Sequence, residues 1–143
     1  KAQLYYYTTD SDSLFSEKST SAAGAVTLKV SHKVSDSIVA NFTAIGYDSL
    51  GTSVGSPLEG TKHTANAYFG EANIALKMDK TTLIIGRQQL DTPMLGSFDW
   101  LLSPSHFEAS TLIQKSNGLT MIASYVKKLR ANNSGEEFVK LAE

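Results

Sequence analysis

The sequence predicts an all-β protein, an antiparallel up-and-down β-barrel whose strands cross a membrane. Apolar residues recur at every second position in about seven segments, as in strands that present one apolar face. Most of these segments have close to the ~9–11 residues with which a tilted strand spans a bilayer. Short and long connections alternate along the chain, so the tight turns gather at one end of the sheet and the long loops at the other, as in transmembrane barrels.

The expected strands follow one another without an intervening helix. They cover residues 2–9, 21–34, 37–48, 65–79, 81–91, 107–116 and 119–129. The alternation is clearest in the second segment, where Val26 and Leu28 occupy even positions and Lys29 an odd one. The tail, SGEEFVKLAE, has the spacing of a short helix instead. The sequence therefore predicts strands throughout, with one short helical piece at the end.

The segments 65–79 and 81–91 are expected to form a hairpin with one apolar and one charged face. In the first of them the even face carries Tyr68, Gly70, Ala72, Ile74, Leu76 and Met78, and the odd face carries Glu71, Asn73, Lys77 and Asp79. If Met78 pairs with Thr82, Asn73 lies opposite Arg87, and Glu71 lies diagonal to Arg87. The polar faces of the two strands then coincide, which makes this register self-consistent.

The connections between strands differ in length in a regular order. Three are very short, namely SDS at 35–37, DKT at 79–81 and SNG at 116–118. In the last of these, Gly118 occupies the position at which a three-residue hairpin needs a left-handed residue. Three are long, at about 10–20, 49–64 and 92–106. The strict alternation favours a membrane barrel over a soluble one.

Composition excludes several classes of function. The chain has 143 residues, enough for one domain, and no cysteine, which removes disulfides, thiol catalysis and zinc–thiolate sites. The net charge is -1 and lysine and arginine form no cluster, so no nucleic-acid partner is expected. The histidines, His32, His63 and His106, are far apart in sequence and predict no metal site. No catalytic motif is present, and we expect neither enzymatic activity nor a cofactor.

The most specific stretch is GRQQLDTPMLGSFDWLLSPSHFEA, residues 86–109. Gly86-Arg87-Gln88, Leu90-Asp91-Thr92-Pro93, then Pro104 and Phe107-Glu108-Ala109 stand in an order and spacing that resemble the outer-membrane porins of the OprD type. The resemblance is greatest to the major outer-membrane porins of epsilon-class proteobacteria, and it covers roughly residues 65–129. Where that family usually has an arginine just before the proline of the loop, this chain has Ser103.

The resemblance implies a barrel of about sixteen to eighteen antiparallel strands in a bacterial outer membrane, commonly assembled as a homotrimer. Residues 1–143 would be the N-terminal portion of that single barrel domain. The family's inward-folded loop corresponds to residues 92–106, which are bracketed by Pro93 and Pro104. This loop is the candidate constriction, with Asp99 and Trp100 near its tip.

The expected function is a passive diffusion channel for small hydrophilic solutes and ions, with the lipid of the outer membrane as the other partner. The candidate pore-lining residues are the polar ones of the strands and their ends: Lys29, Glu71, Asn73, Lys77, Arg87, Gln89, Asp91 and Glu108. Both signs of charge occur among them, so no ionic preference follows. Glu71 and Arg87 either steady the wall as a pair or set selectivity.

The alternative is a soluble β-barrel or β-sandwich that binds a small ligand or a glycan. In that case the apolar faces would point into a core, where the small residues Ala22, Gly24, Gly70, Ala72 and Gly86 would leave voids. Facing lipid, small residues are tolerable. Solubility without detergent separates the two hypotheses, because only the soluble module remains in buffer.

Overall fold

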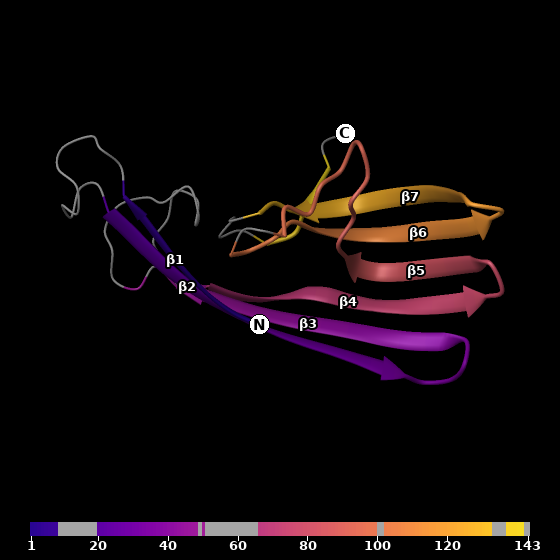
Figure 1. Cartoon of the computed structure of the whole chain (residues 1–143), viewed down its shortest axis with the longest axis horizontal. Coiled ribbons are helices and arrows are strands. Elements are labelled where there is room, and N and C mark those ends of the chain that lie inside the picture. The colour runs from indigo at the N-terminus through magenta and orange to yellow at the C-terminus, as the bar shows by residue number, and fades with distance from the viewer. Residues whose placement is uncertain (9–19, 49, 51–65, 100–101, 133–136, 142–143) are drawn as a thin grey trace.

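The chain forms one eight-stranded antiparallel sheet in which every strand pairs with its neighbours in sequence (Figure 1). The computed structural model describes residues 1–8, 20–48, 50, 66–99, 102–132 and 137–141. The strands are β1 (Ala2–Thr8), β2 (Thr20–Lys33), β3 (Ile38–Asp48), β4 (Asn66–Met78), β5 (Thr81–Gln88), β6 (His106–Ser116), β7 (Leu119–Arg130) and β8 (Val139–Lys140). The predicted all-β, up-and-down architecture is confirmed. The sheet is curved and is not closed.

The tight turns lie at one end of the sheet and the long connections at the other, as predicted (Figure 1). The last tight turn consists of two residues, Asn117 and Gly118, because Ser116 pairs directly with Leu119. Both turn residues have positive φ, at 47° and 81°, which is the backbone of a type I′ hairpin. Gly118 is therefore left-handed as predicted, in a turn one residue shorter than expected.

The predicted register of the β4–β5 hairpin is wrong by one residue. Met78 pairs with Thr81 and not with Thr82, around a turn of Asp79 and Lys80. Asp79 takes a left-handed φ of 46°, which allows the tighter turn. Because side chains alternate along a strand, a shift of one residue moves every side chain of the partner strand to the opposite face.

The shift changes the expected position of Arg87. Arg87 pairs with Ala72, whereas Gly86 occupies the position opposite Asn73 that the sequence had assigned to Arg87. Glu108 of β6 lies opposite Arg87 and shares its face. The expectation that Arg87 and Glu108 share a face with Glu71 and Asn73 is therefore wrong.

The expected face of Tyr68 is also wrong, because β4 contains a β-bulge. Phe42 pairs with Ala72 but Ala44 pairs with Phe69, so Gly70 and Glu71 together stand opposite Thr43 of β3. The extra residue inverts the alternation in the first part of β4. Tyr68, expected on the apolar face, consequently lies on the same face as Glu71, and Phe69 takes its place among the exposed apolar residues.

The tail is not helical in its described part. Val139 and Lys140 form β8, which pairs antiparallel with Leu129 and Lys128 of β7. The predicted short helix is wrong because the apolar spacing of so short a segment does not distinguish a helical turn from an edge strand.

The inner face of the sheet is the face against which the connection between β5 and β6 packs. We call the described residues of this connection, 89–99 and 102–105, the inserted loop, and they pass in front of β6 and β7 in Figure 1. Its Leu102 is completely buried in a cluster with Ala23 and Ala25 of β2 and Ile45 and Tyr47 of β3. On the same face, towards the β7 edge of the sheet, its Leu90 and Leu95 pack with residues of β6 and β7, namely Phe107, Ala109, Val126 and Leu129. The inserted loop therefore spans the inner face from β2 to β7.

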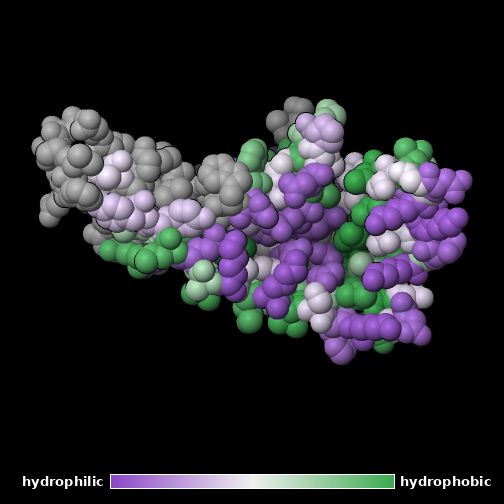
Figure 2. Space-filling view, viewed as in Figure 1, coloured by the Kyte–Doolittle hydropathy of each residue, from purple (hydrophilic) through white to green (hydrophobic). Residues whose placement is uncertain are grey.

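The outer face of the same strands is apolar and exposed. Val26 and Leu28 of β2 are 65% and 61% exposed, and Ile74 and Ile85 continue the exposed surface on β4 and β5. Phe42 and Phe69 stack on this surface with ring centroids 5.0 Å apart. Figure 2 shows hydrophilic residues over the middle and the right of the molecule, and hydrophobic ones along its lower left edge.

Candidate functional site

A row of polar side chains crosses the inner face from β2 to β5. Ser31 Oγ donates a hydrogen bond to Asn41 Oδ1 at 2.7 Å, and Asn41 Nδ2 donates to Asn73 Oδ1 at 3.0 Å. Asn73 Nδ2 in turn donates to the Arg87 carbonyl oxygen at 2.8 Å. The row exists because pairing places Ser31 opposite Asn41 and Asn41 opposite Asn73. Asn73, a predicted pore-lining residue, is the buried link of this row.

An ion pair lies beside the polar row, towards the long loops. Lys29 Nζ is 2.7 Å from Glu71 Oε2, and Thr43 Oγ1 donates to the same oxygen at 2.6 Å. The Glu71 side chain is 12% exposed and the Lys29 side chain 57%, so the carboxylate forms the fixed part of the pair and the ammonium reaches solvent. The partner of Glu71 is thus Lys29 of β2, and the expected contact with Arg87 does not form.

The ion pair borders a polar cavity of about 130 Å³ between the sheet and the inserted loop. Five residues predicted from the sequence meet at this cavity, namely Lys29, Glu71, Gln89, Asp99 and Pro104. The rest of its polar lining consists of Lys1, Gln3, Thr27, Thr43 and His106. Strand residues and loop residues therefore face one another across a small polar space.

Other predicted residues lie elsewhere on the molecule. Lys77 pairs with Thr82 and is exposed near the tight turns. Asp91 organises the inserted loop, since its Oδ1 accepts hydrogen bonds from Ser97 N at 2.9 Å and from Ser97 Oγ at 2.7 Å. Pro93 belongs to an exposed turn of that loop. Trp100 lies outside the described residues.

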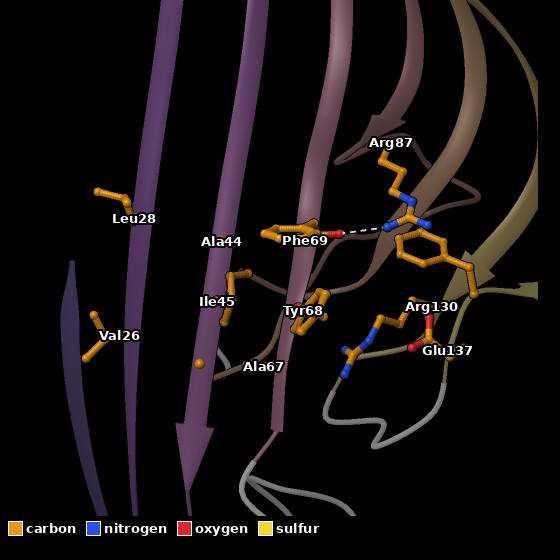
Figure 3. A pocket seen from close by; sticks show the side chains of 12 residues that line it. Val26, Leu28, Ala44, Ile45, Ala67, Tyr68, Phe69, Arg87, Arg130 and Glu137 are labelled. Atoms are coloured by element: carbon orange, nitrogen blue, oxygen red, sulfur yellow. Dashed lines mark hydrogen bonds between the residues drawn. The ribbon is translucent and has the colours of Figure 1, made fainter.

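Arg87 and Glu108 occupy the outer face near the end of β5. There β4 continues beyond β5, and Arg87 Nη1 donates to the Phe69 carbonyl oxygen at 3.3 Å (Figure 3). The Arg87 guanidinium also stacks on the ring of Phe138, 4.2 Å from its centroid. Glu108 lies 4.0 Å from Lys127 Nζ and 3.6 Å from Lys128 Nζ. These contacts stabilise the wall where a strand ends, away from the polar cavity.

A buried polar cluster around Arg130, the last residue of β7, was not predicted from the sequence. Arg130 is 2% exposed, and its guanidinium contacts Ser103 of the inserted loop, Tyr47 of β3 and the ring of Tyr68 of β4. We call these four residues the Arg130 cluster. Its members lie up to 83 residues apart in sequence. An arginine at the end of an apolar strand is the one local signal, and it does not reveal these partners.

His106 adjoins both the cavity and the Arg130 cluster. His106 Nδ1 lies 2.9 Å from the Pro104 carbonyl oxygen and 3.4 Å from Tyr68 Oη. A Cβ atom added at Gly70 would stand 2.5 Å from His106 Nε2, so only glycine allows the imidazole to approach β4 this closely. The sequence analysis placed His106 as an isolated histidine and did not predict this position.

Comparisons with known proteins found no matching family model, no matching curated protein and no matching solved structure. In the part of the chain that the structure describes, no group of three histidine, cysteine, aspartate or glutamate residues is arranged to hold a metal ion. The same part contains no helix with the length and apolarity needed to cross a membrane.

Proposed function

We propose that this chain forms the wall and the constriction of a passive diffusion channel for small hydrophilic solutes and ions in a bacterial outer membrane. The observation that carries the proposal is the chemical opposition of the two faces of the same strands. β2 to β5 carry exposed apolar side chains on one face, and a hydrogen-bonded polar row with an ion pair on the other.

The outer face fits contact with lipid. Its exposed residues include Leu28, Ile74 and Ile85 on three different strands, so the apolar surface extends across the sheet. A contiguous apolar surface of this kind is unfavourable in water, at about 25 cal/mol per Å², and it marks a surface that something apolar covers. In a bilayer the acyl chains provide that cover, while strand pairing satisfies the backbone.

The inner face fits contact with water and dissolved solutes. Lys29 reaches solvent from the wall of the polar cavity, and Asp99 and Gln89 line it from the side of the inserted loop. A loop that packs across the inner face narrows the passage and brings polar groups of both signs towards a passing solute. Because Lys29 and Glu71 neutralise one another, we expect weak discrimination between small cations and anions.

The experiment is to isolate the native polypeptide that contains this sequence and to test its solubility and conductance. We expect it to require detergent and to give stepwise conductance increments in a planar lipid bilayer. A matched control is the same protein denatured by heat before addition to the bilayer. A species that stays in buffer without detergent and gives no conductance would overturn the proposal in favour of the soluble ligand-binding module.

A further inference from the structure

The Arg130 cluster joins four separate elements at one point beneath the inserted loop. Arg130 Nη1 donates to Ser103 Oγ of the loop at 3.0 Å, and Arg130 Nη2 donates to Tyr47 Oη of β3 at 3.3 Å. The guanidinium carbon lies 3.5 Å from the centroid of the Tyr68 ring of β4. Figure 3 shows Arg130 and Tyr68 side by side between β4 and the last strands.

Tyr68 contacts the loop independently of Arg130. Its hydroxyl lies 3.1 Å from Ser103 Oγ and donates to the Pro104 carbonyl oxygen at 3.3 Å. The β-bulge at Gly70 and Glu71 is what directs Tyr68 to this side of the sheet. Ser103 therefore receives contacts from two side chains of different strands, and it is itself completely buried.

The hydrogen bonds from Arg130 and Tyr68 to the inserted loop are directional, whereas the apolar packing of Leu102 is not. Apolar contacts hold the loop against β2 and β3, but they are non-directional and do not by themselves fix its lateral position over the sheet. Hydrogen bonds from a buried guanidinium are stronger than those between neutral groups and have a narrow range of geometry. A buried arginine that loses a partner is also costly, so the loop residues are held in place.

We propose that the Arg130 cluster positions the inserted loop and thereby sets the width of the channel at its narrowest point. This inference rests on the proposed channel function. Arg130 is a positioning residue, since it does not line the polar cavity and acts on solutes only through Ser103 and Pro104. Pro104 lines the cavity directly, so a displacement of Ser103 moves the cavity wall.

The test substitutes one member of the Arg130 cluster at a time in the full polypeptide. Arg130→Met removes the guanidinium and retains an apolar side chain of similar length, Tyr68→Phe removes only the hydroxyl, and Ser103→Ala removes the common partner. Lys80→Met is the matched control, because it removes a cation from a tight turn at the opposite end of the sheet. Each variant is studied by single-channel conductance and by the mobility of a nitroxide spin label on Met94→Cys, a highly exposed position of the loop.

We expect Arg130→Met to raise the conductance about 1.5-fold or more, because conductance follows the narrowest cross-section, and to increase the label mobility. Tyr68→Phe and Ser103→Ala should raise the conductance and the label mobility by smaller amounts. Lys80→Met should change neither the conductance nor the mobility. If all three variants conduct and hold the label as the unsubstituted protein does, the inference is wrong. If Arg130→Met does not fold, the two milder variants decide.

The two proposals fail in different ways. If the unsubstituted protein gives no conductance, the channel function is wrong, and the label mobility alone then tests whether the Arg130 cluster holds the loop. If it conducts and the substitutions leave both conductance and mobility unchanged, only the role of the Arg130 cluster is overturned.

Discussion

Two regions of the inner face share β3 and β4 but organise their polar groups differently. In the region of the polar row, Ser31, Asn41 and Asn73 bond to one another across β2, β3 and β4. In the region beneath the inserted loop, the buried Arg130 and the half-buried Tyr68 bond to loop residues. Strand pairing alone positions the first region, whereas the second depends on a loop that returns across the sheet. The second region should therefore be the more sensitive to substitution.

The largest expected effect is from removal of the apolar side chain that seats the loop. Leu102→Ala removes a completely buried side chain from the cluster with Ala25 and Ile45, and should lower the free energy of unfolding by about 2–5 kcal/mol. This change in the free energy of unfolding is measured by denaturant titration in detergent micelles, with circular dichroism as the readout. Met94→Ala is the control, because Met94 is 92% exposed and should change stability by less than about 0.5 kcal/mol. Equal effects of the two substitutions would mean that Leu102 does not seat the loop.

The boundary between the two regions is tested at Gly70. Gly70→Ala places a methyl group 2.5 Å from His106 Nε2, so the imidazole or the bulge must shift, at a cost of about 1–3 kcal/mol. Gly46→Ala is a matched control on β3, where the nearest atom, the Asn66 carbonyl oxygen, is 3.9 Å from the added Cβ. The same unfolding measurement applies. A Gly70→Ala variant as stable as Gly46→Ala would contradict the close approach of His106.

The polar row should respond less than the loop core. Asn73→Ala leaves Asn41 Nδ2 and the Arg87 carbonyl oxygen without this partner, and should cost about 1–3 kcal/mol because Asn73 is buried. Ser31→Ala at the exposed end of the row should cost clearly less. If both substitutions cost the same, the row would not be anchored at Asn73.

The smallest effect on stability and the clearest effect on function are expected at Lys29. Lys29→Met removes an ammonium that is 57% exposed from a carboxylate that is 12% exposed and keeps its hydrogen bond from Thr43, so we expect a cost of about 1 kcal/mol. The carboxylate of Glu71 then remains without its cation at the polar cavity, so the channel should become cation-selective. The reversal potential in a salt gradient measures this shift. Lys33→Met, which breaks the exposed pair with Asp36 at the tight turn, should leave the reversal potential unchanged.

Strand positions were predictable because an apolar face and three tight turns leave few alternatives. The face on which a side chain lies was less predictable in strands that carry apolar residues on both faces. In β5, Leu83 and Ile85 lie on the outer face and Ile84 on the inner one, so the pattern does not distinguish a register from its neighbour one residue away. The face of Arg87 and Glu108 depended on that register. The face of Tyr68 depended on a bulge at Gly70 and Glu71, and a glycine within a strand suggests a bulge without establishing that one is present.

The candidate site was predictable in part for the same reason. Lys29, Glu71 and Asn73 lie on strands with clear alternation, and the structure brings the first two together with Gln89, Asp99 and Pro104 of the predicted loop. Arg130, Ser103 and His106 were not identified, because their partners come from distant parts of the chain. No spacing rule connects an arginine at the end of β7 with a tyrosine on β3.

The sequence by itself determined which segments are strands, where the tight turns lie and that one face of the sheet is apolar. These follow from local periodicity and from turn residues such as Asn117 and Gly118, which act within a few positions of one another. Only the tertiary structure decided the partner of Glu71, the face of Arg87 and the contacts of Arg130. Those depend on the registers and on the path of the inserted loop, which are settled by packing between residues far apart in the chain.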